Sequence, residues 1–326
     1  MSFYSSVLES LVLPAGDLYL GTPFMQLLRE CRLNDSLAPA ELEAIQRNRL
    51  KETLEHAVRQ SPYYRRLKLS LPEDPYEAVK RFPLLTKKTL REQNDHILTR
   101  PRKGLIRQVS SGSSGVQSTV FLSRYEQSVP RAQQTRWWEW GGYRLGDPLL
   151  QTGMAEKRTP VKAVKDLLLR TEYVHAFALS PEEIASVLKS AKRKGIKHFY
   201  GYASSLFIFA EVADKYGIDL SFQSISSWGD KLFDHYRKKI KTVFGTDVLE
   251  TYGCTEGLMI GAQKDLPYLY IMTPWIYLEL LDDEGREVPD GELGHVVVTS
   301  LTARSFPLIR YKLGDLAISL PRSEYP

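Results

Sequence analysis

The stretch between residues 180 and 251 alternates helical and strand patterns, and this alternation constrains the possible folds more than any other part of the sequence. Ser180-Pro181-Glu182-Glu183 combines an N-cap, a proline at the first helical position and a capping-box glutamate, and apolar residues at helical spacing follow it. Apolar runs predict short strands at 196–200, 224–228 and 248–251. Alternating strands and helices favour an α/β fold whose sheet is largely parallel.

The sequence changes character near residue 268, where β-branched and aromatic residues become frequent. Asp283-Glu284-Gly285 and Asp290-Gly291 are typical turn sequences within this stretch. We therefore expect an antiparallel β subdomain after the α/β core, and an amphipathic helix over residues 41–60 before that core. The expected organisation is an N-terminal helical region over 1–100, an α/β nucleotide- and acid-binding core over 101–265 and a β subdomain over 266–326.

Residues 110–119 form a loop rich in serine and glycine between two short β-like runs. The glycines let the backbone turn so that its N–H groups converge, and the hydroxyl groups add hydrogen-bond donors without bulk. This composition predicts a phosphate-binding loop, although it lacks the lysine and the following helix of a P-loop. A flexible Ser/Gly linker is the alternative. The candidate phosphate-binding residues are Ser110, Ser111, Gly112, Ser113, Ser114 and Gly115.

Two further motifs follow the Ser/Gly loop: Tyr-Gly-Cys-Thr-Glu-Gly at 252–257 and Pro-Leu-Ile-Arg-Tyr-Lys-Leu-Gly-Asp at 307–315. In this order and with these separations, the three motifs resemble those of the adenylate-forming superfamily of acyl-CoA synthetases, peptide-synthetase adenylation domains and luciferases. The likeness is greatest to the phenylacetate-CoA ligase group and the related coenzyme F390 synthetase and CapK groups, and Gly-Tyr-Ala-Ser at 201–204 adds to it.

The resemblance implies the large N-terminal domain of that superfamily, with layered, largely parallel sheets and helices and an antiparallel β subdomain. It also implies ATP-dependent activation of a carboxylic acid to an acyl adenylate, then transfer of the acyl group to a thiol of coenzyme A (CoA) or of a carrier protein's phosphopantetheine. A carboxylate is a poor electrophile, so such an enzyme must hold ATP and the acid in line and neutralise charge at the α-phosphate. The expected cofactors are ATP, Mg²⁺ and CoA.

The second and third motifs supply the candidate nucleotide and metal residues. Glu256 is the candidate Mg²⁺ ligand, because a hard cation that bridges phosphates usually takes one or two protein carboxylates. Thr255 beside it can donate to the α-phosphate. The resemblance implies that Tyr252 and Gly253 contact the adenine, that Asp315 accepts from the ribose hydroxyls, and that Gly229 and Asp230 lie on the nucleotide side. An ordinary turn with a surface carboxylate is the alternative at Glu256 and at Asp315.

The resemblance also implies an acid-binding pocket rich in aromatic and sulfur-containing side chains, which suit a flat apolar group such as an aryl ring. Packing within the core is the alternative for these side chains. Arg310 likewise has two interpretations, contact with phosphate or pairing within the core. The candidate acid-binding residues are Tyr202, Ala203, Ser204, Ser227, Trp228, Leu258 and Met259.

The net charge of +5 is modest and unevenly spread, with two basic clusters at 189–197 and 237–241. Solvated helix faces are one interpretation, and a landing patch for the phosphates of CoA or for an acidic acyl carrier protein is the other. No nucleic-acid-binding motif accompanies the charge. Arg136-Trp137-Trp138-Glu139-Trp140 is interpreted as an aromatic helix packed on the sheet rather than a platform for bases.

The remaining features indicate a cytoplasmic protein without a membrane span. The first twenty residues contain no lysine or arginine, no apolar run is long enough to cross a bilayer, and two cysteines are too few for a disulfide framework. The six histidines show no metal-ligand spacing. The small C-terminal domain of the superfamily and its catalytic lysine do not follow Asp315 in this sequence. We therefore expect either part of a longer enzyme or, as the alternative function, a nucleotide-binding or regulatory module without efficient catalysis.

Overall fold

The computed structural model describes residues 3–109, 117–155, 158–265 and 267–324. These residues form two compact units, each assembled from separate stretches of the chain. Unit 1 comprises Met1–Leu28, Ala132–Cys254 and Met259–Ile271, and unit 2 comprises Arg29–Arg131, Thr255–Leu258 and Met272–Pro326. The chain therefore passes between the units several times, and each unit is described by itself.

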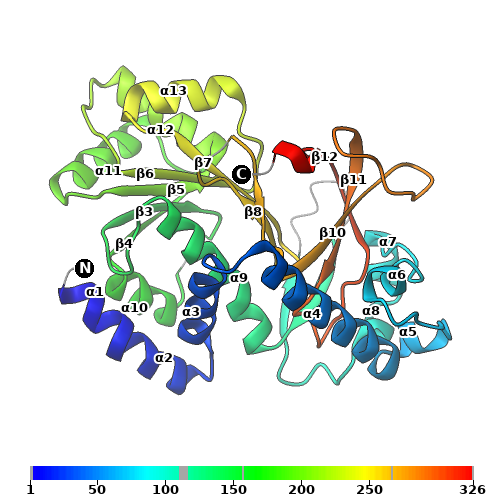
Figure 1. Ribbon diagram of the computed structural model, residues 1–326. Helices are drawn as coiled ribbons and strands as arrows, with labels where there is room; N and C mark the ends of the chain where they lie inside the picture. The colour runs from blue at the N-terminus through cyan, green and yellow to red at the C-terminus, as the bar shows by residue number, and fades with distance from the viewer. Residues whose placement is uncertain (1–2, 110–116, 156–157, 266, 325–326) are drawn as a thin grey trace. The chain divides into compact units, whose positions relative to one another are not determined.

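Unit 1 is built on a seven-stranded sheet with the strand order β4-β3-β5-β6-β7-β8-β9 (Figure 1). The pairs β3/β4, β3/β5, β5/β6 and β6/β7 are parallel, and β8/β9 is antiparallel. This arrangement confirms the largely parallel sheet expected from the alternating pattern. The strands are β3 (Leu149–Gly153), β4 (Thr171–His175), β5 (His198–Tyr202), β6 (Ser224–Trp228), β7 (Val248–Cys254), β8 (Leu258–Ala262) and β9 (Tyr270–Ile271).

Helices α11, α12 and α13 run along one face of this sheet (Figure 1). The start of α11 confirms the predicted capping box, because Ser180 Oγ accepts from the Glu183 N–H at 3.3 Å and Glu183 Oε2 accepts from the Ser180 N–H at 2.7 Å. Apolar side chains of these helices meet those of β5, β6 and β7 in one buried cluster that includes Leu188 and Phe199. The helices of this unit are α1 (Phe3–Val7), η1 (Leu8–Val12), α2 (Leu13–Leu20), the start of α3 (Phe24–Asn34), most of α9 (Arg124–Trp140), α10 (Pro160–Leu168), α11 (Pro181–Arg193), α12 (Ala203–Lys215) and α13 (Asp234–Phe244).

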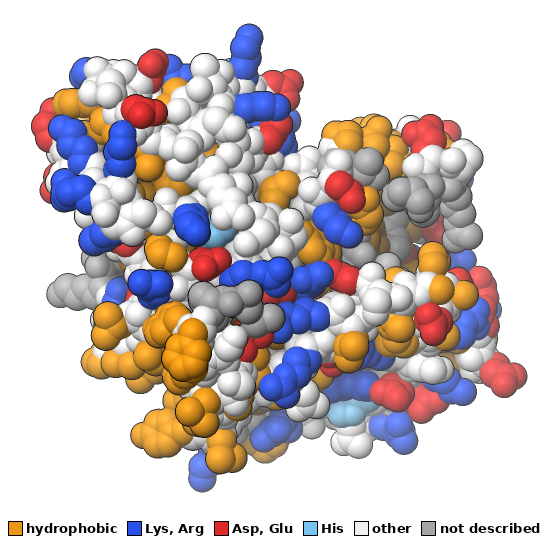
Figure 2. All heavy atoms as spheres, turned by 60° about the vertical axis from the view of Figure 1, so that its left-hand side comes forward, with side chains coloured by type: hydrophobic (Ala, Val, Ile, Leu, Met, Phe, Trp, Pro, Cys, Tyr) orange, Lys and Arg blue, Asp and Glu red, His pale blue; other side chains and the backbone are white. Residues whose placement is uncertain are grey.

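The tryptophans of α9 pack on the sheet as the sequence predicts. The Trp138 ring lies 4.9 Å from that of Tyr200 and 6.1 Å from that of Trp228, and the Trp140 ring lies 6.3 Å from that of Tyr270. Elsewhere on this unit, hydrophobic side chains gather over α1, α2 and α10, at the lower left of Figure 2. They include Leu18 and Leu167, which are 87% and 78% exposed.

Unit 2 holds a three-stranded antiparallel sheet with β11 in the centre, and a separate hairpin of β1 and β2. Helix α4 includes all residues of the helix predicted at 41–60. Gln46 ties it to the rest of this unit, because its Nε2 donates to the carbonyls of Thr273 at 2.8 Å and Ile276 at 2.7 Å. The elements are α4 (Pro39–Gln60), α5 (Pro62–Arg66), α6 (Pro75–Val79), α7 (Lys87–Glu92), α8 (Asn94–Ile97), β1 (Ile106–Val109), β2 (Thr119–Leu122), β10 (Ile276–Leu281), β11 (Leu293–Ser300), β12 (Tyr311–Ile318) and η2 (Arg322–Glu324).

The antiparallel stretch expected after residue 266 is divided between the two units. β10, β11 and β12 form the expected antiparallel sheet, and Gly285 and Gly291 adopt the positive φ values of +81° and +86° that their turns require. β9 instead pairs with β8, through Gly261↔Ile271 and Ala262↔Tyr270, and so extends the seven-stranded sheet. The three contiguous parts expected from the sequence stay a prediction, and the two units cut across them.

Among the helices of the described residues, none combines the length and the apolar character that a bilayer span requires.

Candidate active site

The candidate acid-binding residues in unit 1 lie at the carboxyl ends of adjacent parallel strands. Tyr202 ends β5, Trp228 ends β6, and the two residues are paired across the strands. Ser227 is the preceding residue of β6 and is buried, while Ala203 and Ser204 begin α12. In open α/β sheets, ligands bind outside the carboxyl ends of the strands, so this edge is where a substrate is expected.

Gly229 follows β6 with φ +82° and leaves room for the Tyr202 ring. A Cβ at this position would lie 2.4 Å from Tyr202 Cε1, so any larger residue would displace the ring. The Phe177 ring also packs near Tyr202, with its centre 5.7 Å from that of the Tyr202 ring. Burial raises the pKa of the Tyr202 hydroxyl above its ordinary value. The tyrosine is therefore a neutral, half-buried aromatic wall at this edge of the sheet.

Asp230 fixes the start of α12. Its Oδ1 accepts from the Ala203 N–H at 2.6 Å, and its Oδ2 accepts from the Ser204 N–H at 3.0 Å and from the Ser204 hydroxyl. The first N–H groups of a helix have no partner within the helix, and a carboxylate there also interacts favourably with the helix dipole. In this structure Asp230 therefore joins the end of β6 to the start of α12, and its expected role on the nucleotide side stays a prediction.

The remaining candidate residues of unit 1 lie on the next two strands. Tyr252 and Gly253 belong to β7, and Met259 belongs to β8. Thr251, just before Tyr252, donates its hydroxyl to the Ser227 carbonyl at 2.8 Å and so ties β7 to β6. The predicted acid and adenine residues of unit 1 thus occupy the ends of three adjacent strands and β8, in the order in which these strands pair.

Glu256 is buried in unit 2, where two hydroxyl groups donate to one of its oxygens. Glu256 Oε1 accepts from the Tyr311 hydroxyl at 2.8 Å and from the Ser118 hydroxyl, and the Glu256 side chain is 5% exposed. Its neighbours in the loop are exposed Thr255 and buried Leu258. A surface glutamate in an ordinary turn would not be held in this way. Residues 255–257 do form a turn, but its glutamate is buried, so the arrangement argues against a surface carboxylate at this position.

The hairpin that flanks the Ser/Gly loop also holds the Thr255–Leu258 segment. Gln108 on β1 donates its side-chain amide to the Thr255 carbonyl. Gly257 has φ +89°, and a Cβ there would lie 3.2 Å from Leu122 Cδ1 on β2. Thr255 and Glu256 are consequently positioned by residues on both sides of the loop. The loop residues Ser110, Ser111, Gly112, Ser113, Ser114 and Gly115 lie outside the described residues.

Asp315 lies in an irregular part of β12. The register with β11 shifts between His295↔Leu316 and Val297↔Lys312, which leaves Leu313, Gly314 and Asp315 in a bulge, and Gly314 has φ +100°. Bulges redirect side chains and are common beside active sites. Asp315 is exposed at this bulge. Its assignment to the ribose stays a prediction.

Arg310 has the core-pairing role that was one of its two interpretations. Its Nε donates to Glu279 Oε2 at 3.2 Å, and its Nη2 lies 2.9 Å from Glu279 Oε1. Its Nη1 donates to the carbonyls of Lys80 and Phe82, and both charged side chains are buried. The third motif therefore contains one residue that stabilises unit 2 as well as candidate site residues.

The candidate site residues fall into two groups, one in each unit. The candidate residues did not include Tyr311 and Phe177, and Ser118 was predicted only as a hydroxyl donor of the Ser/Gly loop. Tyr311 belongs to the third motif, and this was the available signal for it. The two basic clusters are interspersed with carboxylates: Lys194 pairs with Glu172 at 2.7 Å, and Lys239 with Asp214 at 2.6 Å. Within the described ranges, no three His, Cys, Asp or Glu side chains gather in a way that could hold a metal ion.

Comparisons with known proteins agree with this geometry. The family model for "AMP-binding enzyme" matches residues 136–303, which is more than half of the chain. Protein CapK of Staphylococcus aureus is 23% identical over 88% of this chain and 64% of its own length. The phenylacetate-coenzyme A ligase of Pseudomonas putida is 24% identical over 90% of this chain and 71% of its own length. The chain thus spans less than two thirds of CapK.

Solved structures share the fold. A 2-hydroxyisobutyryl-CoA ligase in complex with 2-HIB-AMP superposes with a TM-score of 0.70 at 22% identity, over 86% of this chain and 64% of that protein. At this identity the likeness concerns the fold, which is that of an adenylate-forming enzyme. The family model matches more than half of the chain, and the ordered motifs and the candidate residues at the strand ends agree with it. The chain therefore belongs to the AMP-binding enzyme family.

Proposed function

We propose that this protein activates a carboxylic acid with ATP and transfers the acyl group to a thiol. The observation that carries the proposal is the Thr255-Glu256 loop, in which a buried carboxylate is held by two hydroxyl groups directly after a strand of the parallel sheet. Family membership and the likeness to phenylacetate-coenzyme A ligases support the same chemistry. A cytoplasmic location, where ATP and CoA are available, goes with this proposal.

The reaction has two steps. An oxygen of the acid attacks the α-phosphorus of ATP, pyrophosphate leaves, and an acyl adenylate forms. A thiolate sulfur then attacks the acyl carbon, and AMP leaves with the electron pair of the broken bond. In the first step Thr255 donates to the α-phosphate, Tyr252 and Gly253 lie against the adenine, and Asp315 accepts from the ribose hydroxyls. Positioning and charge neutralisation account for such catalysis without an acid-base pair.

The acid is proposed to carry an aryl group. Tyr202 and Trp228 end adjacent strands, and Phe177 packs against Tyr202, so aromatic side chains gather at this edge of the sheet. Aromatic rings favour offset or edge-to-face contact with another ring. The thiol acceptor is proposed to be CoA, with the phosphopantetheine of an acidic carrier protein as the second choice.

The donor set around Glu256 fits Mg²⁺. A carboxylate oxygen is a hard ligand, and Mg²⁺ in nucleotide sites usually takes one or two protein carboxylates while phosphates and water fill its other positions. A lone buried glutamate therefore suffices, and a cluster of carboxylates is not required. When bound, the ion would neutralise phosphate charge. Tyr311 and Ser118 orient the Glu256 carboxylate for this role.

The function is tested by ATP–pyrophosphate exchange and by binding of non-hydrolysable acyl-adenylate analogues, each with a panel of aryl and alkyl acids. We expect the analogue of the correct acid to bind more tightly than ATP, because it contacts the acid pocket and the nucleotide residues at once. We expect the exchange rate to be higher with aryl acids than with alkyl acids. Absence of both exchange and analogue binding across the panel would reject the proposal.

Replacing Glu256 with glutamine tests the metal assignment. Glu256→Gln keeps the size of the side chain and an oxygen that can accept from Tyr311, but it removes the charge that attracts the ion. We expect the Mg²⁺ dependence of ATP binding to weaken by at least about tenfold, while the melting temperature changes little. The measurement is a calorimetric titration of ATP at several Mg²⁺ concentrations.

Two further variants control for this result. Tyr311→Phe removes one donor to Glu256 and keeps the carboxylate, so Mg²⁺-dependent binding should persist. Glu55→Gln removes an equal charge from the exposed surface of α4 and should have no effect. If Glu256→Gln and Glu55→Gln behave alike, Glu256 is not the ligand.

The second candidate function is a nucleotide-binding module without efficient catalysis. One observation favours it: Tyr311 and Ser118 both donate to Glu256 Oε1, and these hydrogen bonds compete with a metal ion for the same oxygen. This candidate predicts ATP or AMP binding that is independent of Mg²⁺, together with no exchange for any acid. The same titrations and exchange assays distinguish the two functions.

A further inference from the structure

The β1–β2 hairpin of unit 2 has two functionally different faces. Successive side chains of a strand point to opposite faces of the sheet. Gln108 and Ser118 point toward the segment that contains Thr255 and Glu256, to which they are hydrogen-bonded. The alternate positions, including Arg107 and Phe121, are paired across the two strands and occupy the opposite face. The hairpin therefore has one face toward the Thr255–Glu256 segment and a second face directed away from it.

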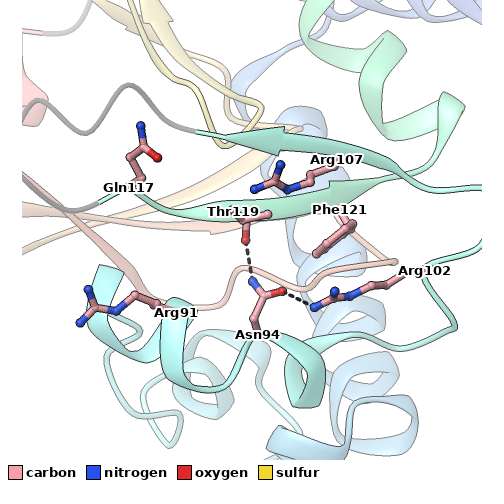
Figure 3. Close-up of a pocket in the computed structure, with 7 residues that line it drawn as sticks. All are labelled: Arg91, Asn94, Arg102, Arg107, Gln117, Thr119 and Phe121. Carbon is pink, nitrogen blue, oxygen red and sulfur yellow. Dashed lines mark hydrogen bonds between the residues drawn. The ribbon is translucent and has the colours of Figure 1, made fainter.

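A pocket of about 210 Å³ lies on this second face (Figure 3). Three arginines from different parts of unit 2 contribute to its lining: Arg91 from α7, Arg102 from the segment before β1, and Arg107 from β1. Gln117 and Thr119 add an amide and a hydroxyl group. A volume of this size corresponds to about seven water molecules, which is enough for a phosphate or a pyrophosphate group.

Arg102 is fixed within this pocket. Its guanidinium lies 4.6 Å from the centre of the Phe121 ring, donates to Asn94 Oδ1 at 3.2 Å and pairs with Asp95 at 2.6 Å. Figure 3 shows Asn94 between Arg102 and Thr119, and its Nδ2 donates to the Thr119 carbonyl at 2.7 Å. The wall of the pocket is thus preorganised by hydrogen bonds between α8, β2 and the segment before β1.

Arg91 and Arg107 differ from Arg102, because the side chain of neither has a hydrogen-bond or ion-pair partner among the residues that the structure describes. The one carboxylate engaged at the pocket, Asp95, pairs with Arg102. Two guanidinium charges are therefore left without a compensating carboxylate. Guanidinium groups match the geometry of phosphate oxygens and bind them through two parallel hydrogen bonds.

We propose that this pocket is an anion site that binds a phosphate group, on the opposite face of the hairpin from the Ser118–Glu256 contact. The ligand is a phosphate monoester, such as the 3′-phosphate of CoA, or free inorganic phosphate or pyrophosphate. Arg91 and Arg107 supply the charge, and Gln117 and Thr119 supply neutral hydrogen-bond partners. Gln117 and Thr119 belong to the Ser/Gly loop, but the three arginines are not among the candidate active-site residues, so the charge of this pocket can be tested independently of adenylation.

The test is calorimetric titration of the whole protein at fixed low ionic strength, since exposed charges are screened by salt. The probes are inorganic phosphate, pyrophosphate, CoA and dephospho-CoA, which lacks the 3′-phosphate. We expect at least one phosphate-bearing probe to bind, and the double variant Arg91→Gln/Arg107→Gln to lose at least tenfold in affinity for it. A preference for CoA over dephospho-CoA would identify a monoester, and tighter binding of phosphate or pyrophosphate would identify a free anion.

Arg100→Gln is the matched control, because it removes an exposed arginine of the same unit that does not line the pocket. This control variant should change the affinity for the probe less than twofold. Each single variant, Arg91→Gln or Arg107→Gln, should lose part of the affinity that the double variant loses. Melting temperatures should stay unchanged, since both arginines are exposed. Failure of every probe to bind, or an equal loss in Arg100→Gln and in the double variant, would overturn the proposal.

Discussion

Each unit buries a cluster of polar side chains, and the two clusters differ in whether these side chains are neutral or charged. In unit 1, His198 is fully buried, its Nδ1 lies 2.8 Å from the Ser224 hydroxyl, and that hydroxyl lies 2.7 Å from the Tyr200 hydroxyl. In unit 2, the buried pair of Arg310 and Glu279 carries full charges. The first cluster stays neutral at neutral pH, and the second is ionised.

The difference lies in what compensates for lost hydration. Asp147 Oδ2 lies 3.6 Å from His198 Nε2, which is beyond hydrogen-bond distance, so burial dominates and lowers the pKa of the imidazole to about 4. Arg310 instead has a carboxylate and two backbone carbonyls around its guanidinium. A buried charge is tolerated only when it is paired and hydrogen-bonded. The two clusters should therefore respond to different perturbations.

The largest expected effect follows removal of one charge from the ionised cluster. Arg310→Met leaves the Glu279 carboxylate buried without its partner, and breaking such a pair costs about 3–5 kcal/mol. Arg310 also adopts φ +49°, which is unfavourable for a residue with a Cβ and is maintained here by its hydrogen bonds. Urea unfolding of the variant measures the loss in the free energy of unfolding.

The control for Arg310→Met is Arg286→Met, which breaks an exposed pair with Asp282 in the same unit. Exposed ion pairs contribute about 1 kcal/mol or less, so this variant should be nearly as stable as the parent. Comparable losses in the two variants would mean that burial of the Arg310 pair is not what makes it important.

The neutral cluster should respond to pH. Because the folded-state pKa of His198 is lowered from 6.5 to about 4, acidification through this range protonates the unfolded chain before the folded protein. Stability should therefore fall as the pH drops below 6.5, with a contribution that approaches about 3 kcal/mol near pH 4 and then levels off. Urea unfolding at several pH values measures this slope.

His198→Phe isolates this contribution from the other titrating groups. The variant keeps an aromatic ring beside Tyr143, whose ring lies 5.3 Å from that of His198, and leaves Ser224 bonded to Tyr200. The stability of the variant should vary less steeply with pH than that of the parent between 6.5 and 4. Parallel pH profiles for the two proteins would show that His198 titrates normally in the folded state.

Core pairing of Arg310 was one of its two interpretations, but the partner residues of neither cluster could be predicted from the sequence, although much of the fold could. The Ser180 capping box and the 224–228 strand depend on neighbouring residues, so local patterns suffice, and both are confirmed. The Arg310–Glu279 pair joins residues 31 positions apart, and the Ser118–Glu256 contact joins residues 138 positions apart. Such pairs depend on strand register and on chain crossings between units, which no local pattern reports.

The candidate site shows the same division. The motifs identified Tyr202, Trp228 and Glu256, and the structure adds the residues that hold them, such as Phe177 and Tyr311. β9 was assigned to the antiparallel subdomain because its residues have ordinary strand propensity, and propensity does not determine the partner strand. Its pairing with β8 could be known only from the structure.

A smaller effect is expected at the surface, where the contrast between a charged and a neutral group recurs at two helix N-termini of unit 1. Asp230 is the charged case, and Asp230→Asn keeps one acceptor oxygen but turns an amide donor toward the donors of α12. We expect a loss of about 1–2 kcal/mol in the free energy of unfolding. Asp219→Asn, at a fully exposed aspartate, should be neutral, and equal losses in both variants would exclude the capping role.

Ser180 is the neutral case, and its replacement should have the smallest effect. Ser180→Ala removes the acceptor for the Glu183 N–H and should cost about 1 kcal/mol. Because no formal charge is lost from the Ser180 side chain, the loss should change little with salt, whereas that of Asp230→Asn should shrink as salt screens the helix dipole. Ser180→Thr should restore stability, and Ser186→Ala, on the exposed side of the same helix, should not reduce it. A Ser180→Ala loss that depends on salt as strongly as that of Asp230→Asn would show that charge does not distinguish the two caps.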